Sequence, residues 1–266
     1  MIKTDTGDKL YIQAIEYVLQ NGSEINPRGL KCTETLGTVL TLTNPQKSLI
    51  TLKERYMAYK FCMAEKFCYL TGNGGENILP RYAKNISKFI NPVTGKFDGA
   101  YGPRLIKQYD YILQLLKKDP DTRQAIMTVN NYHDDLHESL DIPCTLSLQL
   151  LKRQGKLNMI VTMRSNDLLW GFPYDISNFT FLQECFAAEL GVEVGWYQHQ
   201  VGSLHIYEKD IQIFHNILNN QETLPITQEK VPSLSFAELQ REATAAINNR
   251  PTTSKYFTTA KRIFFN

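Results

Sequence analysis

The sequence predicts an α/β (α+β) protein with an extensive sheet and mixed strand connections. Two alternating segments surround "KRQG" at residues 152–155, as expected for strands joined by a tight turn. Several other stretches carry apolar residues at helical spacing. The 266 residues can form a substantial core, and no repeat or low-complexity segment divides them, so we expect a single domain, 1–266.

Composition and charge exclude several classes of protein. The 29 basic and 27 acidic residues leave a net charge of +2, too small to predict nucleic acid or an anionic membrane as the main partner. The five cysteines form no CxxC pair, which favours a reducing compartment, so a cytoplasmic protein without a metal is expected. Neither a signal peptide nor a run of ~20 apolar residues is present, and no membrane association is expected.

The N-terminal half begins with a predicted helix. Residues 8–22, "DKLYIQAIEYVLQNG", carry apolar side chains at helical spacing and end on Gly22, a common stop residue. The following stretch, 23–34, is predicted to be a loop. A second helix is expected at 109–118, "YDYILQLLKK", and "DPDTR" at 119–123 has the composition of a turn.

The strands beside "KRQG" make the first prediction about a site. The first strand, "TLSLQLLKR", begins after Cys144, and the second, "GKLNMIVTMRS", ends near Arg164. Antiparallel pairing therefore places Cys144 near Arg164. Further along, His205 and Tyr207 share one face of a predicted strand because side chains alternate.

Two helices are predicted in the C-terminal half. Residues 175–191, "DISNFTFLQECFAAELG", form a strongly apolar helix with Asp175 at its start and Gly191 after its end. Ser235–Glu238, "SFAE", is a capping-box pattern that opens a last helix, and "NNRPTTSKYF" at 248–257 ends it.

Charged residues gather around an apolar turn in "MRSNDLLWGFPYDISNF", residues 163–179. Arg164, Asp167 and Asp175 are explained either by an arginine neutralised by two carboxylates or by a planar, anionic ligand. Taken alone, Cys144 is more often a buried structural thiol. His205 is likewise more often a satisfied core or surface residue, so only the combination of motifs is specific.

The combined motifs resemble the thymidylate synthase superfamily in order, spacing and chemistry, over most of the chain. The resemblance implies a layered fold with a large mixed sheet. It also implies a homodimer packed sheet to sheet, in which each subunit lends an arginine to the other's phosphate site. The motifs are "NPRG" (26–29), "MAEKFCYLTGN" (63–73), "AYG" (100–102), "DPDTRQ" (119–124), "IPCT" (142–145), the stretch 163–179 and "HIY" (205–207).

The resemblance assigns the chemistry to four residues. Cys144 would be the nucleophile that adds to C6 of a pyrimidine, for which a thiolate is suited as both nucleophile and leaving group. Glu65 would move protons at the ring through water, with Tyr101 beside it as a proton-relay residue. Asp175 would contact the base itself.

The resemblance also assigns the binding residues. Guanidinium groups clamp a phosphate dianion through charge-assisted hydrogen bonds, here of a pyrimidine nucleoside monophosphate. The co-substrate would be 5,10-methylenetetrahydrofolate. The phosphate would be held by Arg28, Arg164 and Ser165 with Arg123 from the partner subunit, the sugar 3′-hydroxyl by His205 and Tyr207, and folate by Asp167, Trp170 and Gly171.

Asp175 departs from the methylase pattern, in which an asparagine donates to uracil O4 and accepts from N3–H. A carboxylate can accept from the 4-amino group of cytosine, and a protonated carboxyl can donate to its N3. The same substitution marks the deoxycytidylate and cytidylate hydroxymethylases, the branch that the chain resembles most. The structural alternative is that Asp175 is the N-cap of the following helix.

Other departures favour the same branch. Phe89 stands where the methylases have a tryptophan beside the reactive methylene. Loss of that indole would admit water, which would form a hydroxymethyl product. Thr145 replaces the histidine after the nucleophile, and Gln124 replaces the second arginine of the phosphate pair. The sequence therefore predicts a C5-hydroxymethylase of dCMP or CMP. The alternatives are a thymidylate synthase or hydroxymethylase acting on dUMP, and a non-catalytic nucleotide- or RNA-binding paralogue.

Overall fold

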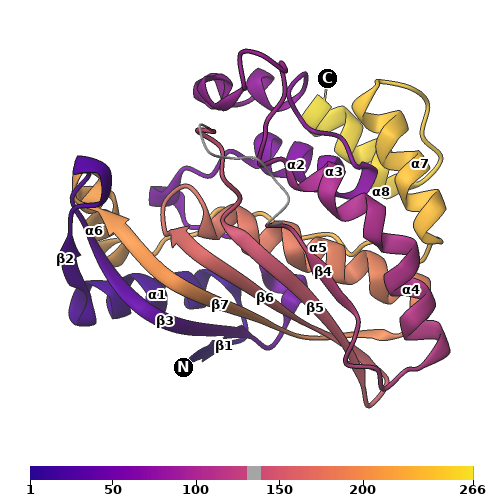
Figure 1. The fold of residues 1–266 in the computed structure, drawn as a ribbon, viewed down its shortest axis with the longest axis horizontal. Helices are drawn as coiled ribbons and strands as arrows, with labels where there is room; N and C mark the ends of the chain where they lie inside the picture. Colours follow the sequence, from indigo (N-terminus) through magenta and orange to yellow (C-terminus); the bar gives the residue numbers. More distant parts are fainter. Residues whose placement is uncertain (131–138, 266) are drawn as a thin grey trace.

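A mixed sheet of seven strands forms the centre of the computed structural model, which describes residues 1–130 and 139–265 (Figure 1). The strand order is β1-β3-β7-β6-β5-β4, and β2 pairs with β3. The pairs β1–β3 and β6–β7 are parallel and the other pairs are antiparallel, which confirms the predicted class. The strands are β1 Ile2–Thr4, β2 Ser23–Ile25, β3 Cys32–Leu42, β4 Ile126–Thr128, β5 Thr145–Arg153, β6 Lys156–Asp167 and β7 Glu193–Tyr207.

The predicted hairpin is present as β5 and β6. Arg153 pairs with Lys156, so the turn consists of Gln154 and Gly155. Both have positive φ, 51° and 73°, the left-handed conformation that a two-residue turn of this kind requires. The turn fixes the register, and the pairing then runs back to Thr145 opposite Met163, beside Cys144 and Arg164.

The helix α5, Phe172–Leu190, connects β6 to β7. Parallel neighbours need such a crossover because a short turn cannot reverse the chain twice. The predicted helix is confirmed, but it begins at Phe172, with Pro173 in its first turn, where the missing N–H costs nothing. Gly171 is the N-cap, so the N-cap explanation of Asp175 is wrong: Asp175 lies in the first turn, inside the helix.

The helices are stacked in layers on one side of the sheet (Figure 1). α1 packs on β3, and α5 packs on β6 and β7. α2 and α7 then cover α5, which is therefore buried almost all round, including Phe179, Leu182, Cys185 and Phe186. The helices are α1 Gly7–Asn21, α2 Tyr59–Thr71, α3 Tyr101–Leu105, α4 Tyr109–Lys118, α5 Phe172–Leu190, α6 Ile211–Asn219, α7 Phe236–Ile247 and α8 Lys255–Ala260.

Two expectations about secondary structure are wrong in part. The loop predicted at 23–34 contains β2 and the start of β3, because Ser23–Ile25 pair antiparallel with Cys32–Glu34. The helix that Ser235 caps is confirmed, with the capping box formed, but it is not the last. The chain turns after α7 and forms α8 and a π-helix, Lys261–Phe265.

The opposite face of the sheet carries half-exposed side chains. Along β7, Trp196, Gln198 and Gln200 alternate with the buried Tyr197 and His199. The sheet-to-sheet homodimer expected at such a face remains a prediction. Among the described helices, none has the length and hydropathy needed to cross a membrane.

Candidate active site

A cavity of about 720 Å³ lies where β6 and β7 end. Parallel pairing sets Ser165 beside Ser203 and Asp167 beside His205, so the functional residues of both strands meet at one edge of the sheet. The cavity brings together seven of the residues predicted from sequence, namely Arg28, Phe89, Cys144, Arg164, Ser165, His205 and Tyr207.

Cys144 and Arg164 are adjacent, as the hairpin predicts. The backbone N–H of Arg164 donates to the carbonyl of Cys144 at 2.9 Å. The guanidinium donates to the carbonyl oxygens of Pro143 and Ile142 at 3.0 Å and lies 3.6 Å from the Cys144 sulfur. Burial raises the pKa of the Cys144 thiol, and the positive charges of Arg164 and Arg28 oppose that rise. The arginine is therefore placed to favour the nucleophilic thiolate.

The arginines predicted to bind phosphate lie in two separate places. Arg28 and Arg164 both line the cavity, and Arg28 has a φ of 55° in the turn between β2 and β3. Arg123 is exposed and lies outside, since its carbonyl accepts from the side chain of Gln149 at 3.0 Å. At ~3.3 Å per residue along β5, residue 149 is about 17 Å from Cys144. Donation of Arg123 to a partner's site remains a prediction.

His205 and Tyr207 project from β7 into the cavity. The His205 ring is 7% exposed, and its Nδ1 donates to the Ser203 carbonyl at 3.3 Å, which fixes the ring. Its centroid lies 5.1 Å from that of Tyr207, edge to face. Burial raises the pKa of Tyr207, the charge of Asp167 adds to the rise, and the Arg28 guanidinium opposes it. Both polar groups are thus held facing the same space.

Two carboxyl groups lie close together behind Cys144. Burial raises the pKa of Glu65 to about 8, and the neighbouring charge of Asp175 adds to the rise. Burial also raises the pKa of Asp175 to about 7. The Nδ2 of Asn178 donates to Glu65 at 3.1 Å and opposes its protonation. A pair of carboxyls that titrate near neutrality can exchange protons with a substrate.

Tyr101 lies beside these carboxyls. Its hydroxyl accepts from the backbone N–H of Thr145 at 3.2 Å, which leaves the phenolic proton to be donated elsewhere. The ring stacks on Phe179 at 6.2 Å and 14°. Burial raises the pKa of Tyr101, and the charges of Asp175 and Cys144 add to the rise, so the phenol stays protonated.

A chain of buried hydrogen bonds ends on Asp175. The Tyr197 hydroxyl lies 2.7 Å from Nδ1 of His199, whose Nε2 lies 2.9 Å from Oδ1 of Asn166. Nδ2 of Asn166 donates to Asp175 at 2.7 Å. Burial lowers the pKa of His199 to about 3, so the imidazole is neutral. This assignment of the Asn166 amide requires His199 to donate from Nε2 and to accept from Tyr197 at Nδ1.

Gly171 makes that chain possible. A Cβ at this position would lie 2.6 Å from Nδ2 of Asn166 and 3.4 Å from the Asp175 carboxyl. Gly171 was predicted to contact folate; its close approach to Asn166 gives it a structural role as well. Only glycine leaves room for the amide that positions Asp175.

The predicted folate residues surround an exposed aromatic ring. Trp170 is 62% exposed. Asp167 accepts from the backbone N–H groups of Leu169 and Trp170 at 2.6 and 3.3 Å, which shapes the turn. Burial raises the pKa of Asp167, and these hydrogen bonds and the charge of His205 oppose it. Trp170 therefore presents a free face on which a planar ligand can stack.

Arg55 was not predicted from the sequence, but it lies beside Trp170, among the predicted folate residues. Its guanidinium lies 5.7 Å from the Trp170 ring and 5.4 Å from the Tyr174 ring, and it donates to the Leu169 carbonyl. Arg55 is 3% exposed, and its Nε has no hydrogen-bond partner among the described residues. Since it lies far from residues 163–179 in the sequence, no local pattern connects it to them.

Asn166, Asn178 and His199 were also not predicted to belong to the site. The amides of Asn166 and Asn178 donate to Asp175 and Glu65, and both stand in the motif 163–179, so their nearness was the available signal. Thr145 does not line the cavity: it is buried and its hydroxyl donates to the sulfur of Met163 at 3.0 Å. The side chain of Thr145 therefore does not contribute to the wall of this cavity.

A family model described as "Thymidylate synthase" matches residues 9–252. The chain belongs to the thymidylate synthase family. It is similar to the deoxyuridylate hydroxymethyltransferase of Bacillus phage SP01, with 30% identity over 247 residues, 83% of this chain and 64% of that protein. It is also similar to a putative thymidylate synthase of Methanocaldococcus jannaschii, with 28% identity over 217 residues, 77% of this chain and 90% of that protein.

The fold agrees with this family. The thermostable thymidylate synthase A of Bacillus subtilis superposes with a TM-score of 0.70 at 24% identity, covering 82% of this chain and 86% of that one. A second hydroxymethyltransferase, from Delftia phage PhiW-14, is 30% identical over 204 residues, 68% of this chain. The chain spans less than two thirds of the two phage enzymes, 64% and 55% of their lengths.

The raised pKa of Glu65 makes stability depend on pH. Between the ordinary value of 4.5 and about 8, the folded protein retains a proton that the unfolded chain releases, so the free energy of unfolding falls as pH rises. Glu65→Gln removes this proton. We expect the wild-type melting temperature to fall more steeply between about pH 5 and pH 8 than that of the variant, measured by calorimetry.

The matched control is Glu193→Gln, an exposed glutamate on β7. This variant should keep the wild-type slope of melting temperature against pH. Equal slopes in all three proteins would contradict the protonated state assigned to Glu65.

Proposed function

We propose that this protein transfers a one-carbon unit from 5,10-methylenetetrahydrofolate to C5 of a cytosine nucleotide, dCMP or CMP, and leaves it as a hydroxymethyl group. The observation that supports the proposal is Asp175, an acid that accepts a hydrogen bond from Asn166 at 2.7 Å and stands where the family's methylases have an asparagine. The cavity around Cys144, with its two arginines, supports a nucleoside monophosphate as the substrate.

The chain's own residues suit the steps of this reaction. Cys144 adds to C6 as the thiolate, favoured by Arg164 at 3.6 Å, and C5 becomes nucleophilic. Folate supplies the one-carbon unit at the oxidation level of formaldehyde. Glu65, protonated in part at neutral pH, delivers and removes protons through water, and Tyr101 donates from its free phenol. Elimination of Cys144 then restores the aromatic ring.

Phe89 supports a hydroxymethyl rather than a methyl product. Its ring lines the wall of the Cys144 cavity and is 36% exposed. A phenyl ring is smaller than the indole that the family's methylases place here, so it leaves room for a water molecule near C5. Water can then add to the exocyclic methylene of the pyrimidine in place of hydride. Trp170, Asp167 and Arg55 would hold folate by stacking and hydrogen bonding.

A second candidate is hydroxymethylation of dUMP. Relatives named deoxyuridylate hydroxymethyltransferase favour it, and so does the pKa of Asp175, raised by burial to about 7. A neutral carboxyl can donate to uracil O4 and accept from N3–H, as an asparagine does. An ionised Asp175 carboxylate would repel the O4 oxygen of uracil. Activity on dUMP would therefore fall as pH rises through about 7 if Asp175 reads uracil in this way.

Asp175→Asn tests the base assignment. The amide donates to O4 and accepts from N3–H, so we expect the variant to lose activity on dCMP or CMP and to gain relative activity on dUMP. Each buried polar group left unpaired costs about 1–3 kcal/mol, so the ratio of kcat/KM values should change by more than tenfold. Steady-state assays of both proteins with the three nucleotides measure this change.

Asp167→Asn is the matched control. The Asp167 carboxyl accepts from the backbone of the turn at Leu169, whereas Asn166 donates to Asp175. It should keep the base preference of the wild type. An unchanged ratio in Asp175→Asn would remove the reason for assigning a cytosine substrate, and a wild type that prefers dUMP would support the second candidate.

Covalent catalysis can be tested separately from base preference. A 5-fluoropyrimidine nucleotide cannot release fluorine from C5, so with folate it should trap a covalent adduct on Cys144, detected by mass spectrometry of peptides. Cys144→Ser should abolish turnover and keep nucleotide binding largely intact. An adduct on Cys32, Cys62, Cys68 or Cys185 would contradict the assignment, and these thiols serve as internal controls.

The proposed homodimer makes a prediction about Arg123. If Arg123 completes the partner's phosphate site, Arg123→Ala and Cys144→Ser subunits are each inactive alone. Mixed subunits should regain activity, because half of each heterodimer's sites then carry neither defect. Activity and the fraction of heterodimer are measured after mixing. Folded variants that mix but stay inactive would mean that Arg123 serves its own chain.

A further inference from the structure

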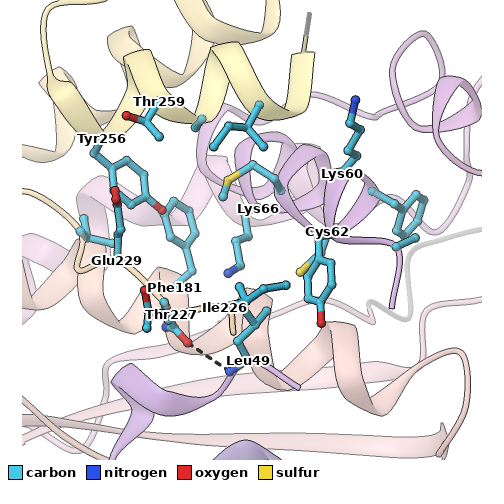
Figure 2. Close-up of a pocket in the computed structure, with 18 of the residues that line it drawn as sticks. Leu49, Lys60, Cys62, Lys66, Phe181, Ile226, Thr227, Glu229, Tyr256 and Thr259 are labelled. Carbon is cyan, nitrogen blue, oxygen red and sulfur yellow. Dashed lines mark hydrogen bonds between the residues drawn. The ribbon is translucent and has the colours of Figure 1, made fainter. Parts of the chain in front are cut away.

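A second cavity, of about 800 Å³, lies beside α2 (Figure 2). It is bounded by α2, α5, α8 and the segment 226–231, and its walls are mostly apolar. It shares no lining residue with the cavity that holds Cys144. Its apolar wall includes Met63, Phe181, Ile226, Tyr256 and Ile263.

Lys66 is the unusual residue of this cavity. It is 5% exposed, and Figure 2 shows its side chain reaching from α2 into the space. The ammonium lies 5.8 Å from the centroid of the Phe181 ring. Within residues 1–130 and 139–265, it has no hydrogen bond and no ion pair. A bound anion would give this ammonium the charge-assisted hydrogen bond that the surrounding side chains do not supply.

Glu184 does not supply the missing partner. One of its carboxylate oxygens accepts from Nε2 of Gln228 at 3.2 Å, and the other accepts from the backbone N–H of Val231 at 3.1 Å. Both contacts tie down the segment 226–231 that forms one wall. Burial raises the pKa of Glu184, and the Val231 N–H and the nearby Lys66 charge oppose that rise, but the two side chains form no ion pair.

The wall opposite α2 is held in place independently of any ligand. The buried carboxylate of Glu242 on α7 accepts from Thr253 and Ser254, from the N–H of each and from the Thr253 hydroxyl, at 2.7–3.2 Å. These bonds fix the turn that leads into α8. The cavity is therefore preformed, as small-molecule sites usually are.

We propose that this cavity binds a small amphipathic carboxylate, with its head group on Lys66 and its apolar body against Met63, Phe181 and Tyr256. A cavity of about 800 Å³ is within the range of ~300–1,000 Å³ typical of small-molecule sites. Lys60 and Arg81 also line the cavity, but both are exposed, so Lys66 is the one buried cation of its lining and matches a monoanion. The paired arginines expected to clamp a phosphate dianion, Arg28 and Arg164, line the other cavity.

Dodecanoate, used below its micelle concentration, is the probe, and dodecanol is its neutral counterpart. Calorimetric titration of the wild type should give a saturable site for dodecanoate. Lys66→Met keeps the apolar stem and removes the charge, so the Kd for dodecanoate should rise at least tenfold. Binding of dodecanol should stay the same or tighten, because the charge no longer has to be desolvated.

Two further variants complete the test. Lys107→Met removes an exposed lysine outside the cavity and should leave both Kd values unchanged. Thr259→Trp fills the cavity from α8 and should abolish binding of both probes, which keeps the test independent of Lys66. The proposal is overturned if the wild type does not bind dodecanoate, or if Lys66→Met or Thr259→Trp binds it as the wild type does. Nucleotide binding should be unchanged throughout.

Discussion

Parallel pairing of β6 with β7 is the constraint on which the candidate active site depends. It sets Ser165 beside Ser203 and Asp167 beside His205, so the residues predicted to bind phosphate and sugar come from neighbouring strand ends. A parallel pair also requires a crossover, and α5 provides it immediately after β6. Because α5 begins so close to the end of β6, its first turn delivers Asp175 to the same edge of the sheet.

Amides hold the two acids near Cys144, and among the described residues neither acid forms an ion pair with a cation. Asn178 donates to Glu65, and Asn166 donates to Asp175. An amide satisfies part of a carboxyl without fixing its charge, so both groups keep a raised pKa and can exchange protons near neutrality. An arginine in either place would lower the pKa and hold the acid ionised. This choice of partner suits proton transfer at a pyrimidine ring.

Two consecutive residues of α2 have different surroundings. Glu65 and Lys66 are consecutive, and successive residues of a helix point about 100° apart. The Glu65 carboxyl therefore lies against Asn178, while the Lys66 side chain lies in the apolar cavity. Cys62 connects the two sides, since its thiol donates to Asn178 at 3.7 Å and also lines the apolar cavity. A ligand that contacts Cys62 would therefore be connected to Glu65 through two hydrogen-bonded residues, Cys62 and Asn178.

Features that follow from local rules could be predicted from the residue pattern. The turn at Gln154 and Gly155, the apolar periodicity of α5 and the motif order predicted the sheet, the family and the nearness of Cys144 to Arg164. Three features became visible only in the folded protein. They are the hydrogen-bond chain from Tyr197 to Asp175, the position of Arg55 beside Trp170, and the position of Lys66 in an apolar cavity. These depend on contacts between segments far apart in the sequence, and neither spacing nor propensity specifies which distant side chains will meet.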